Sequence, residues 1–429
     1  MAIEVRPIEP GEAVDYLKVL PYANGLPHWE PVPAAWYGGP EPWPTPNRPA
    51  TPEQLEAWAG QVLAERCHPQ AAFDGDRIVG ASAMISFELT VPGGRQVPMG
   101  GVTSTAVIAT HRRRGLLRRM MQAMFDEAVE RGEPIAGLSA SEGTIYGRYG
   151  YGPATLRTRW EVDRTQAVFR DAEPDSGRLE LTDAATARAA WRTVHDHVRR
   201  TRVGELSARP GHWEDLSDSA SDTRGPQRHL VHHAAAGGID GVAVFRIPWS
   251  TTVQNAGTLV VEGIQAATPA AYRALWRLLL DFDLTRTIVA APRPGDEPLR
   301  WMLENPRALR VTRQSDSLWL RLLDVPAALE ARTYDVPDRI VIGIEADPMR
   351  PDNVGRWQLS ADPDGASCTR VAATPDVVLE LSALGSLYLG GRSAADLAYA
   401  GRIKGGAAAV GRLSRLFRTD PEPFNSFVF

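Results

Sequence analysis

The stretch from residue 97 to residue 129 constrains the fold of this chain more than any other part. Residues 97–109 form an extended run, and a helical stripe follows after a short basic junction. The stripe consists of Leu117, Met120, Met121, Met124 and Ala128, which recur at the spacing of one helical face. Arg131 and Gly132 are typical of a helix C-terminus. A strand that leads directly into an amphipathic helix predicts a sheet covered by helices.

Further periodic segments surround this unit. Apolar runs predict strands at 77–87, continued by 88–91, and at 134–139, and a helical pattern covers 54–66. A second α/β segment follows, with strands expected at 229–235, 241–247, 258–267 and 287–291 and a helix at 270–282. Pro269 stands where that helix begins, a position that proline favours. The repeated order of strands and helices indicates two mixed α/β layers.

The last third of the chain has a different order of elements. Short strands are expected at 318–323, 339–344, 357–361, 369–373 and 377–381, and helices at 393–403 and 408–417. The chain has 429 residues, about three times the ~150 residues of a typical domain. We therefore expect an α/β (α+β) protein with units at 1–155, 156–308 and 309–429.

Composition and charge exclude several classes of protein. Apolar residues make up 43% of the chain, charged residues 23%, and the net charge is −5, so a disordered chain and a generally basic nucleic-acid binder are both unexpected. The two cysteines, Cys67 and Cys368, indicate neither a disulfide framework nor a cysteine-based zinc site. No apolar run reaches the ~18 residues of a membrane span, and no signal peptide is recognisable at the N-terminus, so we expect a soluble cytoplasmic protein.

Two local features are informative in different ways. Residues 21–53 are rich in proline, glycine and tryptophan, so they cannot form one regular element and are expected to form an ordered loop or lid. The adjacent His232 and His233 resemble a metal pair. Neighbouring strand residues point to opposite faces, however, and we interpret both as structural.

The junction between the strand and the helix carries the chemistry. Backbone N–H groups in the first turn of a helix have no internal partner, and the helix dipole adds positive charge, which suits a phosphate. Gly115 lets a ligand approach the backbone, and the arginines at 112–114 and Arg118 offer charge-assisted contacts. A solvated basic helix cap would explain the same string, and a nucleic-acid patch would also do so.

Two longer motifs decide between these interpretations. The spacing Arg112-x-x-Gly115-x is similar to the acetyl-CoA signature of GNAT N-acetyltransferases, although Leu117 departs from its last position, and the longer string Thr110-His-Arg-Arg-Arg-Gly-Leu-Leu117 resembles the Eis family within them. The string Ala140-Ser-Glu-Gly-Thr-Ile-Tyr-Gly-Arg-Tyr-Gly-Tyr-Gly-Pro-Ala-Thr155 resembles the Eis (enhanced intracellular survival) acetyltransferases of that superfamily, as do 322–332 and 384–390. This resemblance implies two tandem GNAT-like domains followed by a sterol-carrier-protein-like domain.

The resemblance also implies a binding site for acetyl-CoA as co-substrate, with no metal. The backbone at Thr105, Ala106 and Val107 would hold the pantetheine arm and stabilise the oxyanion. The cradle for the pyrophosphate would consist of Arg113, Arg114, Gly115, Leu116, Leu117 and Arg118. Ser141 and Glu142 match family positions that line the cofactor.

The resemblance assigns the proton transfers to Tyr146 and Phe429. Tyr146 would be the general acid that protonates the CoA thiolate; its alternative role is an aromatic plug, while Tyr149 and Tyr151 are assigned to packing. The terminal carboxylate of Phe429 would be the general base. The last six residues contain three aromatic and no charged side chains, so we expect this tail to be docked, and a purely structural anchor is its alternative role. Val428 stands where some family members carry an acidic residue, which predicts a less acidic pocket floor.

The acceptor is expected to be the amine of a cationic molecule such as an aminoglycoside, acetylated by direct transfer. Protein or peptide lysines and polyamines are the enzymatic alternatives, and a lipid-binding scaffold with vestigial catalysis is the alternative of a different class. Trp213 and Trp58 are weak candidates for the wall of the acceptor pocket. The second unit has no Arg-x-x-Gly string after its strand at 258–267, so it would shape the pocket rather than bind acetyl-CoA. The family also implies a homo-oligomer, a hexamer, and no nucleic-acid or membrane partner.

Overall fold

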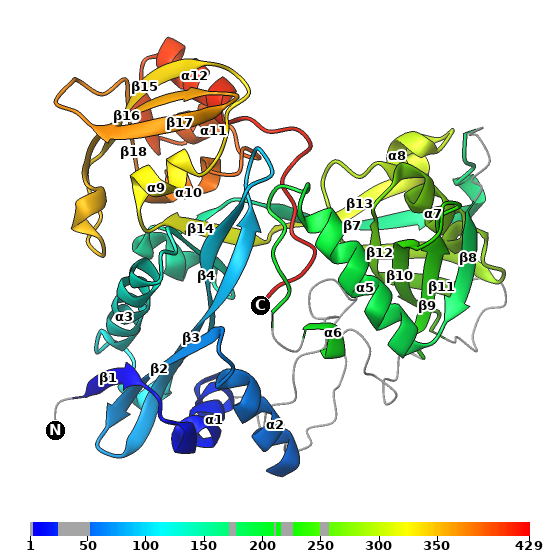
Figure 1. The fold of residues 1–429 in the computed structure, drawn as a ribbon, viewed down its shortest axis with the longest axis horizontal. Helices are drawn as coiled ribbons and strands as arrows, with labels where there is room; N and C mark the ends of the chain where they lie inside the picture. Colours follow the sequence, from blue (N-terminus) through cyan, green and yellow to red (C-terminus); the bar gives the residue numbers. More distant parts are fainter. Residues whose placement is uncertain (1–2, 25–51, 171–176, 210–211, 216–225, 249–256) are drawn as a thin grey trace.

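Three β-sheets organise the molecule (Figure 1). This computed structural model describes residues 3–24, 52–170, 177–209, 212–215, 226–248 and 257–429. No helix in these ranges is both long and apolar enough to cross a bilayer. The proline-rich segment 21–53 is described only at its two ends, where residues 21–24 belong to the first helix and residues 52–53 to the second. The loop or lid that we expect between them lies outside the described residues.

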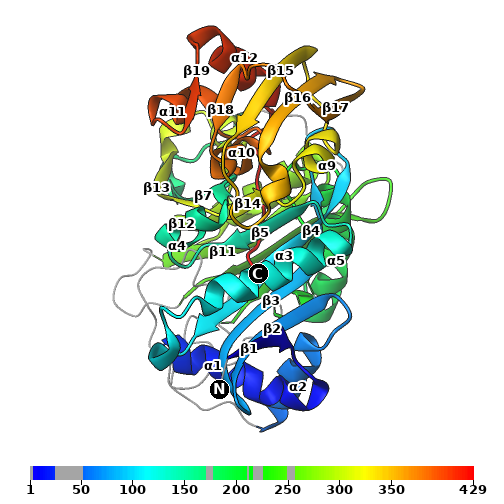
Figure 2. The same cartoon turned by 90° about the vertical axis from the view of Figure 1, so that its left-hand side faces the viewer.

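The first sheet has seven strands and carries the junction singled out above. In spatial order they are β1 (Glu4–Pro7), β2 (Cys67–Asp74), β3 (Arg77–Thr90), β4 (Gln96–Val107), β5 (Ile135–Ser139), β14 (Leu318–Leu322) and β6 (Gly152–Pro153). The helices of this unit are α1 (Ala13–Asn24), α2 (Pro52–Val62), α3 (Leu116–Glu130) and α4 (Gly143–Tyr146). Helix α3 lies across β1–β4 (Figure 2) and buries Leu116, Met120, Met121, Met124, Phe125 and Ala128. The predicted stripe is thus the core-facing side of α3, except that Leu117 is half-buried at its margin.

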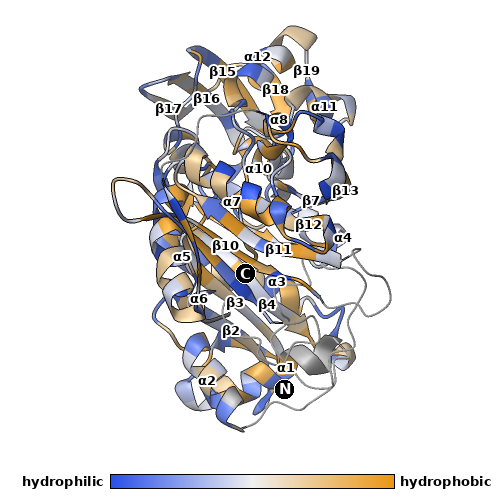
Figure 3. Ribbon diagram, turned by 90° about the vertical axis from the view of Figure 1, so that its right-hand side faces the viewer, coloured by the Kyte–Doolittle hydropathy of each residue, from blue (hydrophilic) through white to orange (hydrophobic). Residues whose placement is uncertain are grey.

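The second sheet also has seven strands. Their order is β13 (Leu309–Asp316), β7 (Leu156–Asp163), β12 (Thr285–Arg293), β11 (Gly257–Ala266), β10 (Ile239–Arg246), β9 (Arg228–His233) and β8 (Arg178–Thr182). Helices α5 (Ala184–Arg199) and α7 (Pro269–Asp281) pack on this sheet, and Figure 3 shows α7 beside the apolar strands β10 and β11. Thr268 caps α7 by accepting a hydrogen bond from Ala271 N at 3.1 Å, with Pro269 in the first turn as expected. The short helices α6 (His212–Asp215) and α8 (Leu299–Met302) complete this part of the fold.

The third sheet is small and is covered by helices. Its order is β17 (Gly365–Arg370), β16 (Gly355–Asp362), β15 (Asp338–Ile344), β18 (Val377–Leu379) and β19 (Ile403–Gly405). The helices are α9 (Val325–Glu330), α10 (Leu381–Leu387), α11 (Ala394–Tyr399) and α12 (Ala407–Phe417). The helix expected at 393–403 ends earlier, at Tyr399, because Gly401 adopts φ 78° and β19 begins two residues later.

The strand partners cross the division expected at residue 309. β13 pairs with β7 in the second sheet, and β14 then pairs with β5 and β6 in the first sheet. The chain therefore returns to the first unit before it enters the third at Val325. The apolar pattern at 318–323 predicts the strand β14 itself. It does not predict which strands β14 pairs with, because that depends on the path of the whole chain.

Candidate active site

The strands β4 and β5 separate at the centre of the first sheet. Their parallel register runs from Met99 opposite Ile135 to Val102 opposite Leu138, while β4 continues to Val107. The register with β3 also shifts here, and Ser104 adopts φ 52°. The backbone that follows Val102 thus stays paired with β3, but β5 no longer pairs with it on the other side, which leaves its β5-facing edge open. The candidate residues Thr105, Ala106 and Val107 all lie on this diverging part of β4.

The helix that follows begins with a left-handed turn. Gly115 is its N-cap at φ 74°, Arg113 has φ 63°, and no side chain caps the first turn. The first intrahelical bond of the described junction runs from Arg119 N to Gly115 O at 3.1 Å, so the amides of residues 116–118 precede it. Arg113, Arg114, Gly115 and Arg118 are exposed, whereas the side chain of Leu116 is buried. The turn therefore presents backbone donors and guanidinium groups to solvent, which is the chemistry that an anionic phosphate needs.

Two buried polar atoms in the described part of the first unit have no partner. Within the described residues, the Ser139 hydroxyl at the end of β5 and the Tyr151 hydroxyl are buried and have no hydrogen-bond partner. A pantetheine arm carries amide donors and acceptors, so the Ser139 hydroxyl, at the end of β5, fits such a ligand. Ser141 and Glu142, which follow β5, are exposed at the rim. No group of three metal-ligating side chains was found among the described residues.

Tyr146 lies at the end of α4 with its ring buried. Its ring meets that of Tyr151 edge to face, with centroids 6.3 Å apart. Burial raises the pKa of Tyr146 above its ordinary value of 10, and a hydrogen bond with Ser141 partly opposes this shift. The phenol is therefore protonated across the physiological range, which is the state in which it can donate a proton.

A buried ion pair supports the loop that carries Tyr146. Arg321 on β14 donates through Nη2 to both carboxylate oxygens of Asp347 at 2.8 Å, and the two side chains are 1% and 0% exposed. Arg321 also donates to the Tyr149 carbonyl and lies over the Phe125 ring, 4.7 Å from its centroid. Because Asp347 belongs to the third unit, this unit contributes directly to the order of the loop.

The last residues of the chain fill the space between the first and second units (Figure 1). The Phe429 ring lies 4.7 Å from the Phe87 ring and is packed on Gly101, where a Cβ atom would come within 2.6 Å of it. Gly101 immediately precedes Val102, the last residue of β4 that pairs with β5. The Phe427 ring contacts the ring of His212, with centroids 4.2 Å apart. The tail thus ends beside the opening.

Polar anchors hold this tail from several units. Thr155 Oγ1 donates to Asn425 Oδ1 at 2.8 Å, and Ser426 N lies 3.1 Å from both carboxylate oxygens of Glu205. Gln265 Nε2 on β11 donates to Ser426 Oγ at 3.1 Å. These anchors fix the backbone three residues before the terminal carboxylate. Nothing in the single sequence distinguished Glu205 or Gln265, because each is an isolated polar residue without a motif.

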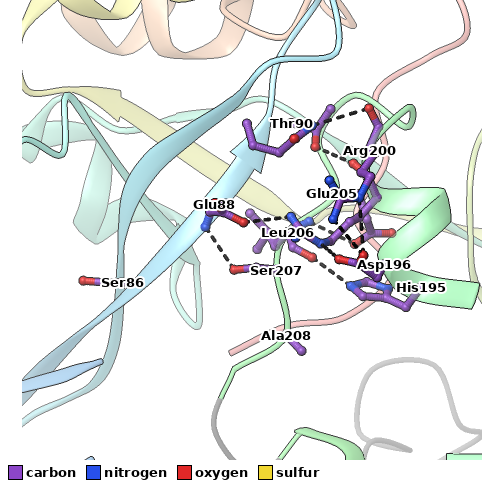
Figure 4. Close-up of polar contacts among 12 residues, drawn as sticks. Ser86, Glu88, Thr90, His195, Asp196, Arg200, Glu205, Leu206, Ser207 and Ala208 are labelled. Atoms are coloured by element: carbon purple, nitrogen blue, oxygen red, sulfur yellow. Dashed lines mark hydrogen bonds and ion pairs between the residues drawn. The ribbon is translucent and has the colours of Figure 1, made fainter. Parts of the chain in front are cut away.

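A segment of the second unit lies along the C-terminal part of β3, beyond the residues that pair with β2 (Figure 4). Thr90 N donates to Glu205 O at 3.0 Å, and Ser207 N donates to Glu88 O at 2.9 Å. His195 of α5 donates from Nε2 to the Leu206 carbonyl at 2.8 Å (Figure 4). Backbone pairing thus joins the two units next to the docked tail.

A cavity of about 960 Å³ lies at this junction. Phe87, which contacts the tail, forms one part of its wall, and Trp213 and His195 of the second unit form another. Trp58, in contrast, packs against the core cluster of α1, β2 and β3 and is not in the cavity lining. The structure therefore brings Trp213, but not Trp58, to the cavity next to the tail.

The equivalent opening in the second sheet is filled. Strands β11 and β12 are parallel and paired only as far as Val261 opposite Ala290. Beyond this point, Arg293 donates to the Ile264 carbonyl at 3.2 Å and to Glu297 at 2.7 Å, and its side chain is buried. Side chains thus occupy the space that stays open in the first unit. His232 and His233 on β9 contact different acids, Asp240 and Glu180.

Comparisons with known proteins agree with this architecture. Residues 44–154 and 204–322 each match an acetyltransferase (GNAT) domain family, and residues 325–426 match the sterol carrier protein domain. An uncharacterized N-acetyltransferase of Streptomyces avermitilis is 39% identical over 360 residues, which cover 82% of this chain and 86% of the relative. The N-acetyltransferase Eis of Mycobacterium tuberculosis is 33% identical over 388 residues, which cover 88% of this chain and 93% of the relative.

A solved structure extends the likeness to the whole fold. The crystal structure of Eis1 from Mycobacterium abscessus covers 100% of both chains with a TM-score of 0.82 and 31% sequence identity. The expected order of two GNAT-like units and a sterol-carrier-protein-like unit is confirmed. The open β4–β5 strand pair, the basic helix start and these relatives together show that the chain belongs to the Eis family of N-acetyltransferases, whose GNAT fold implies acetyl-CoA as co-substrate.

Proposed function

We propose that this N-acetyltransferase transfers the acetyl group directly to an acceptor amine, with Tyr146 as general acid and the Phe429 carboxylate as general base. The observation that carries the proposal is the position of the tail: the Phe429 ring is packed on Gly101, one residue before β4 and β5 separate. This position of the ring supports a base that lies near the strands proposed to hold the thioester.

The chemistry requires a neutral amine, a polarised carbonyl and a protonated leaving group. The Phe429 carboxylate takes a proton from the amine, directly or through water. Backbone N–H groups on the diverging part of β4, around Thr105–Val107, stabilise the oxyanion that forms during attack. Tyr146 then donates its proton to the departing thiolate, and the pKa raised by burial keeps that proton available. The basic turn at 113–118 holds the pyrophosphate.

A turnover assay tests these roles. Release of CoA thiol is measured with acetyl-CoA and a panel of amines, for the wild type, Tyr146→Phe and the chain extended by one glycine. The extension keeps the Phe429 ring but moves the carboxylate away from it, and Tyr149→Phe is the matched control for the phenol. We expect both site variants to lose roughly a hundredfold or more in kcat while remaining folded. Full activity of the extended chain would remove the terminal carboxylate from the mechanism.

The acceptor, the bound lipid, the oligomeric state and the location each have a test of their own. The acceptor that we propose is a cationic amine such as an aminoglycoside, so the turnover assay includes aminoglycosides, with polyamines and lysine peptides as the alternatives. A lipid-binding scaffold would instead retain lipid after purification, which mass spectrometry of an organic extract detects. The homo-oligomer, expected to be a hexamer, is tested by light scattering, and the expected cytoplasmic location by cell fractionation.

A further inference from the structure

A second cavity, of about 330 Å³, lies where the loop after Tyr146 meets the third unit. Gly147, Arg148 and Gly150 of that loop form part of its wall. The rest of the wall comes from β14 and from the third unit, including the strand β19, which carries Lys404. The mechanism described above leaves this cavity without a role.

Two ion pairs are closed within the wall of this cavity. Arg321 Nη2 lies 2.8 Å from Asp347 Oδ1, and Arg402 Nε lies 3.2 Å from Glu380 Oε2. The charges of these four side chains are therefore compensated. The Nε atom of Arg321 is nevertheless buried without a hydrogen-bond partner among the described residues, and a buried donor of this kind is normally satisfied by water or by a ligand.

Two further cations of the wall have no acid that neutralises them. Within the described residues, neither Arg148 nor Lys404 forms an ion pair, and Arg148 donates only to the Thr144 carbonyl, at 3.3 Å. Glu345, an exposed carboxylate of the same wall, has no ion pair in the described part of the chain either. Two uncompensated positive charges beside one negative charge favour a ligand that is anionic and also carries a hydrogen-bond donor.

The basic turn at 113–118 adjoins this cavity. Arg118 of that turn donates to the carbonyl of Pro348, a residue of the cavity wall, at 3.3 Å. Burial raises the pKa of the Tyr149 phenol, and the positive charges of Arg148 and Arg118 both oppose this shift, so both guanidinium groups lie close enough to act on the phenol. One arginine side chain therefore spans the distance from the start of α3 to the cavity.

We propose that this cavity binds the 3′-phosphoadenosine end of acetyl-CoA, with Arg148 and Lys404 as the partners of the 3′-phosphate. The inference rests on the proposed function, because it takes the pyrophosphate to lie on the turn at 113–118. In CoA the pyrophosphate is joined directly to the ribose that carries the 3′-phosphate, so a pyrophosphate on this turn brings the nucleotide within reach of the cavity. The adenine amino group and the ribose hydroxyl supply donors for Glu345. The third unit then takes part in binding the co-substrate.

The scarcity of lysine makes Lys404 directly observable. Lys18 and Lys404 are the two lysines of the chain, and reductive methylation with isotope-labelled formaldehyde labels both amines for NMR while keeping their charge. Lys18 lies in α1, pairs with Asp15 and is the internal control. We expect CoA to shift the Lys404 signal, and dephospho-CoA, which lacks only the 3′-phosphate, to leave it in place. An unmoved signal, or an equal shift by dephospho-CoA or by inorganic phosphate, would overturn the inference.

Calorimetry measures how much affinity the 3′-phosphate contributes. We expect the wild type to bind CoA roughly tenfold or more tightly than dephospho-CoA, the factor of one charge-assisted hydrogen bond. Lys404→Gln and Arg148→Gln are each expected to reduce this ratio, and the double variant is expected to bring it close to one without changing the affinity for dephospho-CoA. Lys18→Gln is the matched control and should keep the wild-type ratio.

The outcomes separate this inference from the proposed function. Equal affinity of the wild type for both ligands would overturn the inference and leave the roles of Tyr146 and Phe429 intact. A ratio that the double variant retains would place the 3′-phosphate elsewhere and would also overturn it. A chain that binds neither ligand would refute the placement of the co-substrate on the turn at 113–118, and the inference with it.

Discussion

Breaking the ion pair between Arg321 and Asp347 is expected to destabilise the fold and the loop of the proposed catalytic acid together. At 2.8 Å and an effective dielectric constant of ~20, the attraction between the two charges is about 6 kcal/mol. Desolvation of two fully buried groups offsets much of it, so the net contribution is small. Removing one partner leaves the other charge buried, and we expect Arg321→Met and Asp347→Leu each to cost about 3–5 kcal/mol of unfolding free energy.

The double variant separates the ion pair from its surroundings. In the double variant, the Tyr149 carbonyl loses the hydrogen bond that it accepts from Arg321. The backbone amides of Met349 and Arg350 lose the hydrogen bonds that they donate to Asp347, at 3.2 and 3.1 Å. We therefore expect a cost above zero but below the sum of the single variants, with a coupling of about 2–4 kcal/mol. Urea unfolding followed by tryptophan fluorescence measures all four proteins. Additive single costs, with coupling below about 0.5 kcal/mol, would refute the reasoning.

Three further changes test the tail and its anchors. Gly101→Ala places a Cβ atom against the rings of both Phe87 and Phe429, which displaces the tail, so we expect kcat to fall roughly a hundredfold with an unchanged KM for acetyl-CoA; unchanged kcat would contradict it. Glu205→Gln weakens the hold on Ser426 N, and we expect roughly a tenfold lower kcat that thermal stability does not explain. Burial lowers the pKa of His212 well below 6.5 in the folded state. The packing of the neutral His212 ring therefore stabilises the fold fully above pH 6.5, and this stabilisation is lost as the pH falls through the folded-state pKa. His212→Phe should therefore flatten the loss of melting temperature between pH 7 and pH 5, and an unchanged slope would be evidence against this.

The helices that could be predicted from the sequence are those in which buried apolar and exposed polar residues alternate at the period of the helix. The α3 stripe has a polar opposite face, so its pattern predicts both the helix and its buried side. Helix α10 was missed because all seven of its residues are buried, which removes the contrast on which a periodic pattern depends. The extent of α11 was overestimated because the apolar pattern continues across Gly401 into β19.

The candidate site divides in a similar way. The basic turn and Tyr146 lie in contiguous motifs, so one sequence is enough to propose them. Glu205 and Gln265 become neighbours of the tail only when the second and third units assemble, and their roles depend on contacts far apart in the sequence. Their identification therefore required coordinates.

The crossing of β14 determines how this chain can be divided. A fragment that ends at residue 155 would contain β5 without its neighbour β14, since Leu318–Leu322 come from much later in the sequence. Its sheet would end in an unpaired apolar edge, a surface that readily joins other strands and aggregates. The first unit is thus expected to require the later part of the chain in order to fold. Recombination that moves the acetyltransferase unit with its sheet complete is therefore expected to carry the second unit along as far as β14.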